Sequence, residues 1–70
     1  QNLDELAKFY AKIKPANAAE ILQQDNQLSD TTVAELLRKL PAQQMGKIMA
    51  NMLPDRAAKI TNLLQELGTR

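Results

Sequence analysis

Four acidic side chains that lie near one another along the chain, Glu20, Asp25, Asp30 and Glu35, are the best candidates for metal chemistry. Carboxylate oxygens are hard ligands, and Mg²⁺ is often held in proteins by one or two carboxylates together with retained water. Most of the eight acidic residues, however, have Lys or Arg three or four positions away, which favours surface pairing. We therefore assign no metal ligand and keep the four acids as an alternative magnesium site.

Catalysis by Cys or His is excluded because the chain contains neither residue. Ser29 is the only Ser, and no base lies beside it in a recognisable motif, so its side chain is better explained as a helix cap. Asp25 and Asp30 flank one turn, but their spacing is not diagnostic of paired catalytic carboxylates. The only glycines, Gly46 and Gly68, form no phosphate-binding loop. The sequence predicts no enzyme, no catalytic residue and no cofactor.

The overall charge also narrows the classes of partner. Nine basic and eight acidic residues leave a net charge of +1, which gives no electrostatic basis for binding nucleic acid or an anionic membrane. Only two aromatic residues are present, so there is no stacking platform for single strands. Residues 1–70 are expected to be a single helical-repeat domain. Because the chain opens on Gln1, we expect it to be a C-terminal fragment of a longer protein, with an anchor or a homodimerising segment upstream.

Five segments carry apolar residues at the i, i+3, i+4, i+7 spacing of an amphipathic helix. Pro15, Pro41 and Pro54 disfavour helical geometry at the preceding residue and suit a helix start. Ser29 or Asp30 should cap the third helix. The predicted helices cover residues 3–13, 15–24, 30–40, 41–52 and 54–67. Their inward faces are Leu6, Phe9, Tyr10 and Ile13; Ala18, Ile21 and Leu22; Val33, Leu36, Leu37 and Leu40; Met45, Ile48, Met49 and Met52; and Ala57, Ile60, Leu63, Leu64 and Leu67.

The connections between these helices are only one to four residues long, so we expect successive helices to pack on their neighbours in an all-α superhelical stack. Gly46, inside the fourth helix, predicts a close helix–helix approach, and Gly68 predicts a left-handed C-terminal cap. Side chains at helical spacing also predict surface ion pairs. These pairs are Asp4 with Lys8, Glu35 with Arg38 or Lys39, and Asp55 with Lys59.

Two groups of apolar side chains are candidates for binding another protein. The methionines at 45, 49 and 52 occupy positions that Ile and Leu hold elsewhere, so core packing is the preferred interpretation, although Met-rich faces also bind varied partners. The first and last helices have a neighbour on one side only, and the ends of stacked repeats are either capped or used for binding. The predicted partner-binding side chains are Leu3, Phe9, Met49, Met52, Leu63 and Leu67.

The segments Tyr10 to Leu22, Val33 to Leu37 and Pro54 to Leu64 carry a resemblance to a known superfamily. They resemble the intracellular N-terminal domain of MgtE magnesium transporters and, more closely, MotE-like and flagellar-operon YlxF-like proteins. Those proteins carry Tyr-x-x-(Met/Ile)-Lys-Pro-x-x-Ala-Ala-x-Ile-Leu, then Val-Ala-Glu-Leu-Leu, then two Pro-led units. The resemblance covers nearly the whole chain and implies a right-handed superhelix of short helices, related also to the middle domain of the flagellar rotor protein FliG.

The resemblance further implies a non-enzymatic role. MotE-like relatives act outside the cytoplasm as chaperones or stabilisers of motor components, behind an N-terminal signal or membrane anchor. MgtE domains sense magnesium in the cytoplasm through acidic interfaces, whereas Gln, Asn and Ala stand here where acid-rich repeats would be expected. Our leading hypothesis is a protein–protein interaction module of a bacterial, membrane-anchored or extracytoplasmic protein that binds flagellar motor components. The alternative is a cytoplasmic magnesium-responsive regulatory domain of an MgtE-type transporter.

Overall fold

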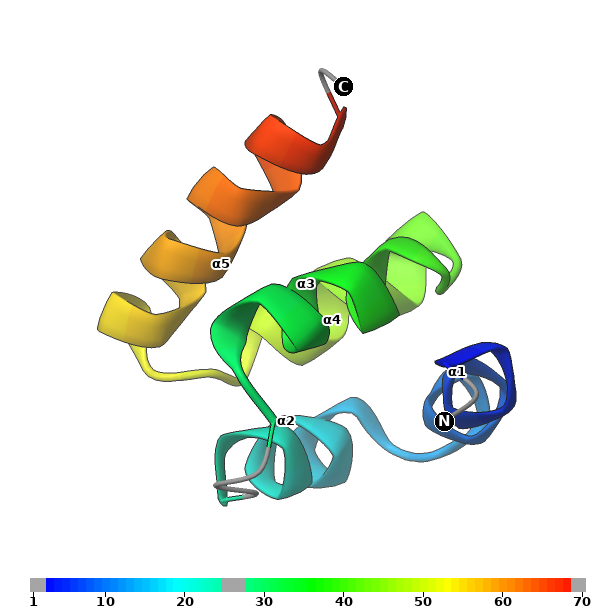
Figure 1. Ribbon diagram of the computed structural model, residues 1–70. Coiled ribbons are helices and arrows are strands. Elements are labelled where there is room, and N and C mark those ends of the chain that lie inside the picture. The colour runs from blue at the N-terminus through cyan, green and yellow to red at the C-terminus, as the bar shows by residue number, and fades with distance from the viewer. Residues whose placement is uncertain (1–2, 25–27, 69–70) are drawn as a thin grey trace.

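Five short helices account for most of the chain (Figure 1). The computed structural model describes residues 3–24 and 28–68, and it places no β-strand in those two ranges. The predicted all-helical fold and the number of helices are therefore confirmed. The helices are α1 (Leu3–Lys12), α2 (Pro15–Gln24), α3 (Asp30–Arg38), α4 (Ala42–Ala50) and α5 (Pro54–Gly68). The predicted turn at residues 25–27 lies outside the described residues.

The helices begin where the local sequence predicts. Pro15 and Pro54 are the first residues of α2 and α5, where the missing proline N–H costs no hydrogen bond. Pro41 lies one residue earlier, as the N-cap of α4. Ser29 has an extended backbone, and its Oγ accepts a hydrogen bond of 3.1 Å from the backbone N–H of Thr32. The capping role predicted for Ser29 is thus confirmed.

Each helix packs mainly on the next helix but one: α1 on α3, α2 on α4, and α3 on α5. The prediction that successive helices pack on their neighbours was wrong for most pairs. Among consecutive helices, only α3 and α4 are in substantial contact. Helices of nine or ten residues are about 15 Å long, and tight turns make consecutive ones cross. Figure 1 shows α1 nearly end-on while α3 runs across the view. As a result, each helix lies alongside the second helix after it in the chain.

The core forms along these contacts and is entirely apolar among the described residues. Small side chains on α2 and α3, namely those of Ala18, Ala19 and Ala34, are at most 1% exposed and let neighbouring helices approach closely. Burial of each large aliphatic side chain contributes roughly 1.5–3 kcal/mol. The largest fully buried side chains are those of Leu22, Val33, Leu36, Leu37, Ile48 and Ile60.

Two predicted core residues lie at the surface instead. Phe9 is 51% exposed and Ile21 is 42% exposed. Both lie at the edge of an apolar stripe whose inward positions are taken by Tyr10 and Leu22. Because α1 has its main contact only with α3, and α2 only with α4, one neighbour covers less of each helix than the periodicity suggests. The three methionines do pack on the core: Met52 is buried, and the other two are partly buried.

Neither glycine has the predicted role. A Cβ added to Gly46 would meet no atom within 4 Å, because this face of α4 is exposed, so no close helix approach occurs there. Gly68 is the last residue of α5, and no described glycine has a positive φ, so it forms no left-handed cap. Both residues lie in ordinary helical backbone.

The ion pairs also differ from those predicted, because the packing of α1 on α3 brings Lys39 to Asp4. The Lys39 Nζ lies 2.9 Å from the Asp4 Oδ1, while Lys8 pairs with Glu5 at 3.7 Å. The predicted pair of Asp4 with Lys8 is not among the ion pairs found in the described residues. The other two predicted pairs, Glu35 with Arg38 or Lys39 and Asp55 with Lys59, are absent from the ion pairs of the described residues.

Candidate interaction surface

The three described acids among the candidate magnesium ligands, Glu20, Asp30 and Glu35, do not converge. Asp30, the first residue of α3, is engaged by Arg56, and Glu20 accepts a 3.5 Å hydrogen bond from Gln24. Glu35 is exposed on α3, and Asp25 lies outside the described residues. Over residues 3–24 and 28–68, no group of three or more Asp, Glu, His or Cys side chains is arranged to hold a metal ion.

The residues predicted to bind a partner differ widely in exposure. Phe9 is exposed, whereas Met52 is only 7% exposed, so the Met52 side chain belongs to the core. Leu3 and Met49 are partly buried on α1 and α4, and Leu63 and Leu67 are partly buried on α5. The six residues therefore lie on three helices and one turn.

A junction of three helices surrounds the turn before α5. The Arg56 Nε donates to the Asp30 Oδ1 at 2.9 Å, and its Nη1 donates to the main-chain carbonyl of Gln23 at 3.3 Å. The Gln23 Oε1 in turn accepts from the backbone N–H of Leu53 at 2.7 Å. Side chains and main chain from α2, α3 and α5 therefore hold this turn in one conformation.

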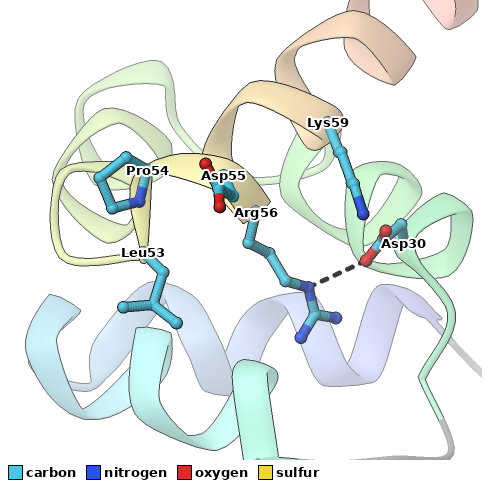
Figure 2. Close-up of a pocket in the computed structure, with 6 residues that line it drawn as sticks. All are labelled: Asp30, Leu53, Pro54, Asp55, Arg56 and Lys59. Atoms are coloured by element: carbon cyan, nitrogen blue, oxygen red, sulfur yellow. Dashed lines mark hydrogen bonds and ion pairs between the residues drawn. The ribbon is translucent and has the colours of Figure 1, made fainter.

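Leu53 projects from the turn with 68% of its surface exposed, the highest value among the large apolar side chains described (Figure 2). Two open hollows share it as a lining residue. The first, of about 570 Å³, is also lined by Asp30, Pro54, Asp55, Arg56 and Lys59. The second, of about 540 Å³, is also lined by Ala16, Asn17, Glu20, Gln23, Gln24 and Asn51. We call Leu53 and these two hollows the Leu53 surface.

The periodicity missed Leu53 because it occupies no position of the helical template. The residue before a proline is disfavoured in helical geometry, so a turn at Leu53 could be predicted. Its exposure could not, because Leu40 also precedes a proline and is buried. The hydrogen bond that the Leu53 N–H donates to Gln23, 30 residues earlier, had no signal in the sequence.

The equivalent position of α4 makes a similar link. Gln44 and Arg56 are each the third residue of their helix. The Gln44 Nε2 donates to the carbonyls of Tyr10 and Ile13 at 2.9 and 3.0 Å, at the end of α1, just as Arg56 donates to Gln23 at the end of α2. The first turn of one helix thus satisfies carbonyl groups that the helix three places earlier leaves free.

The ion pair of Asp4 with Lys39 is more exposed than that of Asp30 with Arg56. The pKa of Asp4 is lowered from 3.8, chiefly by the hydrogen bond from Lys39, then by the charge of Lys39 and, least, that of Lys8; partial desolvation opposes the shift. An exposed pair of this kind contributes little to stability. Its value here is as a reporter of the α1–α3 contact.

Comparison with known proteins gives one match. The family model for the MgtE intracellular N domain matches residues 1–68. Searches of curated proteins and of solved structures give no significant match. No helix in the described part of the chain is long and apolar enough to cross a bilayer. Because the match extends over almost every residue and the fold is all-helical, this chain belongs to the MgtE intracellular N-domain family.

Proposed function

We propose that this chain is a protein–protein interaction module of a bacterial, membrane-anchored protein associated with flagellar motility, where it acts as a scaffold or chaperone. Membership in the family supports a helical, non-catalytic regulatory or interaction module. The motility role rests on the resemblance of Tyr10 to Leu22 and Pro54 to Leu64 to MotE-like proteins.

The observation that supports an interaction module most directly is the Leu53 surface. Single exposed apolar side chains are common and need no special explanation. Leu53 differs because the 2.7 Å hydrogen bond from its own backbone to Gln23 fixes the turn, and because it stands between two hollows. A turn whose backbone is already fixed loses less conformational entropy on binding than a mobile one. This turn is therefore well suited to contact another protein.

The direct test is co-purification with flagellar stator and rotor proteins, using the full-length protein, a deletion of this domain and Leu53→Ser. We expect one motor protein to be retained by the wild type, lost with the domain, and retained less by Leu53→Ser. The matched control is Ile21→Ser, which removes an exposed apolar side chain that lines neither hollow. Failure of every stator and rotor protein to bind in a domain-dependent manner would contradict the proposal.

The magnesium-responsive alternative is separated by titrating Mg²⁺ into the ¹⁵N-labelled chain. Our proposal predicts only small, uniform amide shifts, because the Asp30 carboxylate already forms an ion pair with Arg56. Localised shifts at Glu20, Asp30 and Glu35 at millimolar Mg²⁺ would instead favour the regulatory domain of a transporter.

A further inference from the structure

We propose that the Leu53 surface binds an extended peptide segment whose apolar side chain contacts Leu53 and is flanked by a basic residue on one side and an acidic residue on the other. This inference rests on the proposed function and specifies the chemistry of the partner. It is carried by the polar groups and charges that line the two hollows on either side of Leu53.

The second hollow is lined by amide side chains, which suit the main chain of a peptide. Asn17, Gln23, Gln24 and Asn51 each carry both donor and acceptor atoms. The Gln23 Oε1 accepts from the N–H of Leu53, the Gln24 Nε2 donates to Glu20, and the Asn51 Nδ2 donates to the carbonyl of Lys47. Each of these amides keeps further donor or acceptor capacity. An extended peptide presents alternating N–H and C=O groups that such amides match. Extended segments are therefore better occupants than helices, whose main-chain groups are already paired.

The two hollows also differ in charge. Among the described residues, Glu20 is the only charged one that lines the second hollow. The first hollow is lined by two cations, Arg56 and Lys59, and by two carboxylates, Asp30 and Asp55. Asp30 pairs with Arg56, and Figure 2 shows Lys59 also reaching toward Asp30. Asp55 lies beyond Arg56, next to Pro54. Lys59 forms none of the ion pairs found among the described residues. The complementary partner is therefore basic where it meets Glu20 and acidic where it meets Lys59.

The test uses synthetic peptides of about nine residues, which extend over roughly 30 Å and so exceed the 25 to 28 Å dimensions of the molecule. Each has a central Leu, and its two flanks carry Lys and Glu, Lys and Lys, Glu and Glu, or Gln and Gln. Binding is followed by amide shifts of the ¹⁵N-labelled chain. We expect the Lys/Glu peptide to shift amides of residues that line the two hollows and to bind roughly three- to tenfold more tightly than the other peptides.

Charge reversal in the protein makes the test specific. Glu20→Lys leaves both flanks basic and should prefer the Glu/Glu peptide, whereas Lys59→Glu should prefer the Lys/Lys peptide. Leu53→Ser should weaken all peptides by about tenfold or more, as expected for loss of a central apolar contact, and Ile21→Ser should not. Circular dichroism confirms that each variant retains its helices. Absence of localised shifts, an unchanged charge preference, or self-association through Leu53 in sedimentation would overturn the proposal.

The two proposals fail in different ways. If a motor protein binds the wild type and Leu53→Ser equally well, the Leu53 surface is not the binding site, although the interaction function stands. If no motor protein requires the domain, the proposed motility function fails, whatever the peptides do.

Discussion

Arg56 donates from its Nε to the Oδ1 of Asp30 at a distance of 2.9 Å, across 26 residues of sequence. Both side chains are largely shielded from solvent, with 23% and 35% of their surfaces exposed. Arg56 also donates to the carbonyl of Gln23, so it links the end of α2 and the start of α3 to the first turn of α5. The geometry of the Leu53 turn depends on that link.

The first prediction concerns the strength of this junction. Arg56→Met keeps much of the apolar stem and removes both hydrogen bonds, so we expect the free energy of unfolding to fall by about 1–2 kcal/mol. Arg38→Met is the matched control, because Arg38 is exposed and forms none of the ion pairs found, and it should change stability by less than about 0.5 kcal/mol. Urea unfolding measures both. Equal losses in the two variants would contradict a structural role for the Arg56 contacts.

Gln44→Ala should lower stability by about 1 kcal/mol, because it removes the two hydrogen bonds to the carbonyls of Tyr10 and Ile13. We also expect faster amide hydrogen exchange at the end of α1. Gln43→Ala, at the exposed neighbouring position, should leave both the unfolding midpoint and the exchange of α1 unchanged. If exchange in α1 is equally slow in the two variants, these hydrogen bonds do not hold the end of α1.

Gly46→Ala should stabilise the protein by about 0.5–1 kcal/mol, since Ala is favoured over Gly inside a helix. The added methyl group has no atom within 4 Å, so no clash offsets the gain. For a domain of this size, the increase in Tm should be several degrees, on the order of 4–8 °C per kcal/mol, as measured by thermal unfolding. A decrease in Tm would show that the face of α4 around Gly46 is more crowded than the structure indicates.

The pair of Asp4 and Lys39 predicts a dependence of stability on pH. Because the folded state lowers the pKa of Asp4 below 3.8, its small stabilising contribution is fully present above that value and is lost as the pH falls through the lowered pKa. Asp4→Asn should therefore be slightly less stable than the wild type at neutral pH and equal to it in strong acid.

The direct measurement is an NMR titration of the Asp4 carboxyl group. Lys39→Met should return the pKa of Asp4 toward 3.8, because it removes both the hydrogen bond and the larger of the two favourable charges. High salt should reduce the shift in the wild type, since both side chains are exposed. A pKa of Asp4 that does not change in Lys39→Met would contradict the pairing of α1 with α3 at this point.

Much of the local structure could be read from the sequence. The prolines at 15 and 54 and the Ser29 cap placed the helix starts, because these residues act on the backbone immediately next to them. The apolar spacing correctly predicted most of the core, including Leu22, Leu36 and Ile60. The partner-binding residues named from the sequence stay a prediction: Phe9 is exposed, whereas Leu53, the most exposed large apolar residue described, was not among them.

The sequence by itself therefore determined five amphipathic helices, their starts and the family to which the chain belongs. Only the tertiary structure decided that alternate helices pack together, that Lys39 rather than Lys8 pairs with Asp4, and that Gln23 and Arg56 fix the turn at Leu53. The physical reason is the distance along the chain over which each effect acts. Capping and periodicity act within a few residues, whereas the direction in which each turn sends the next helix decides which distant side chains meet.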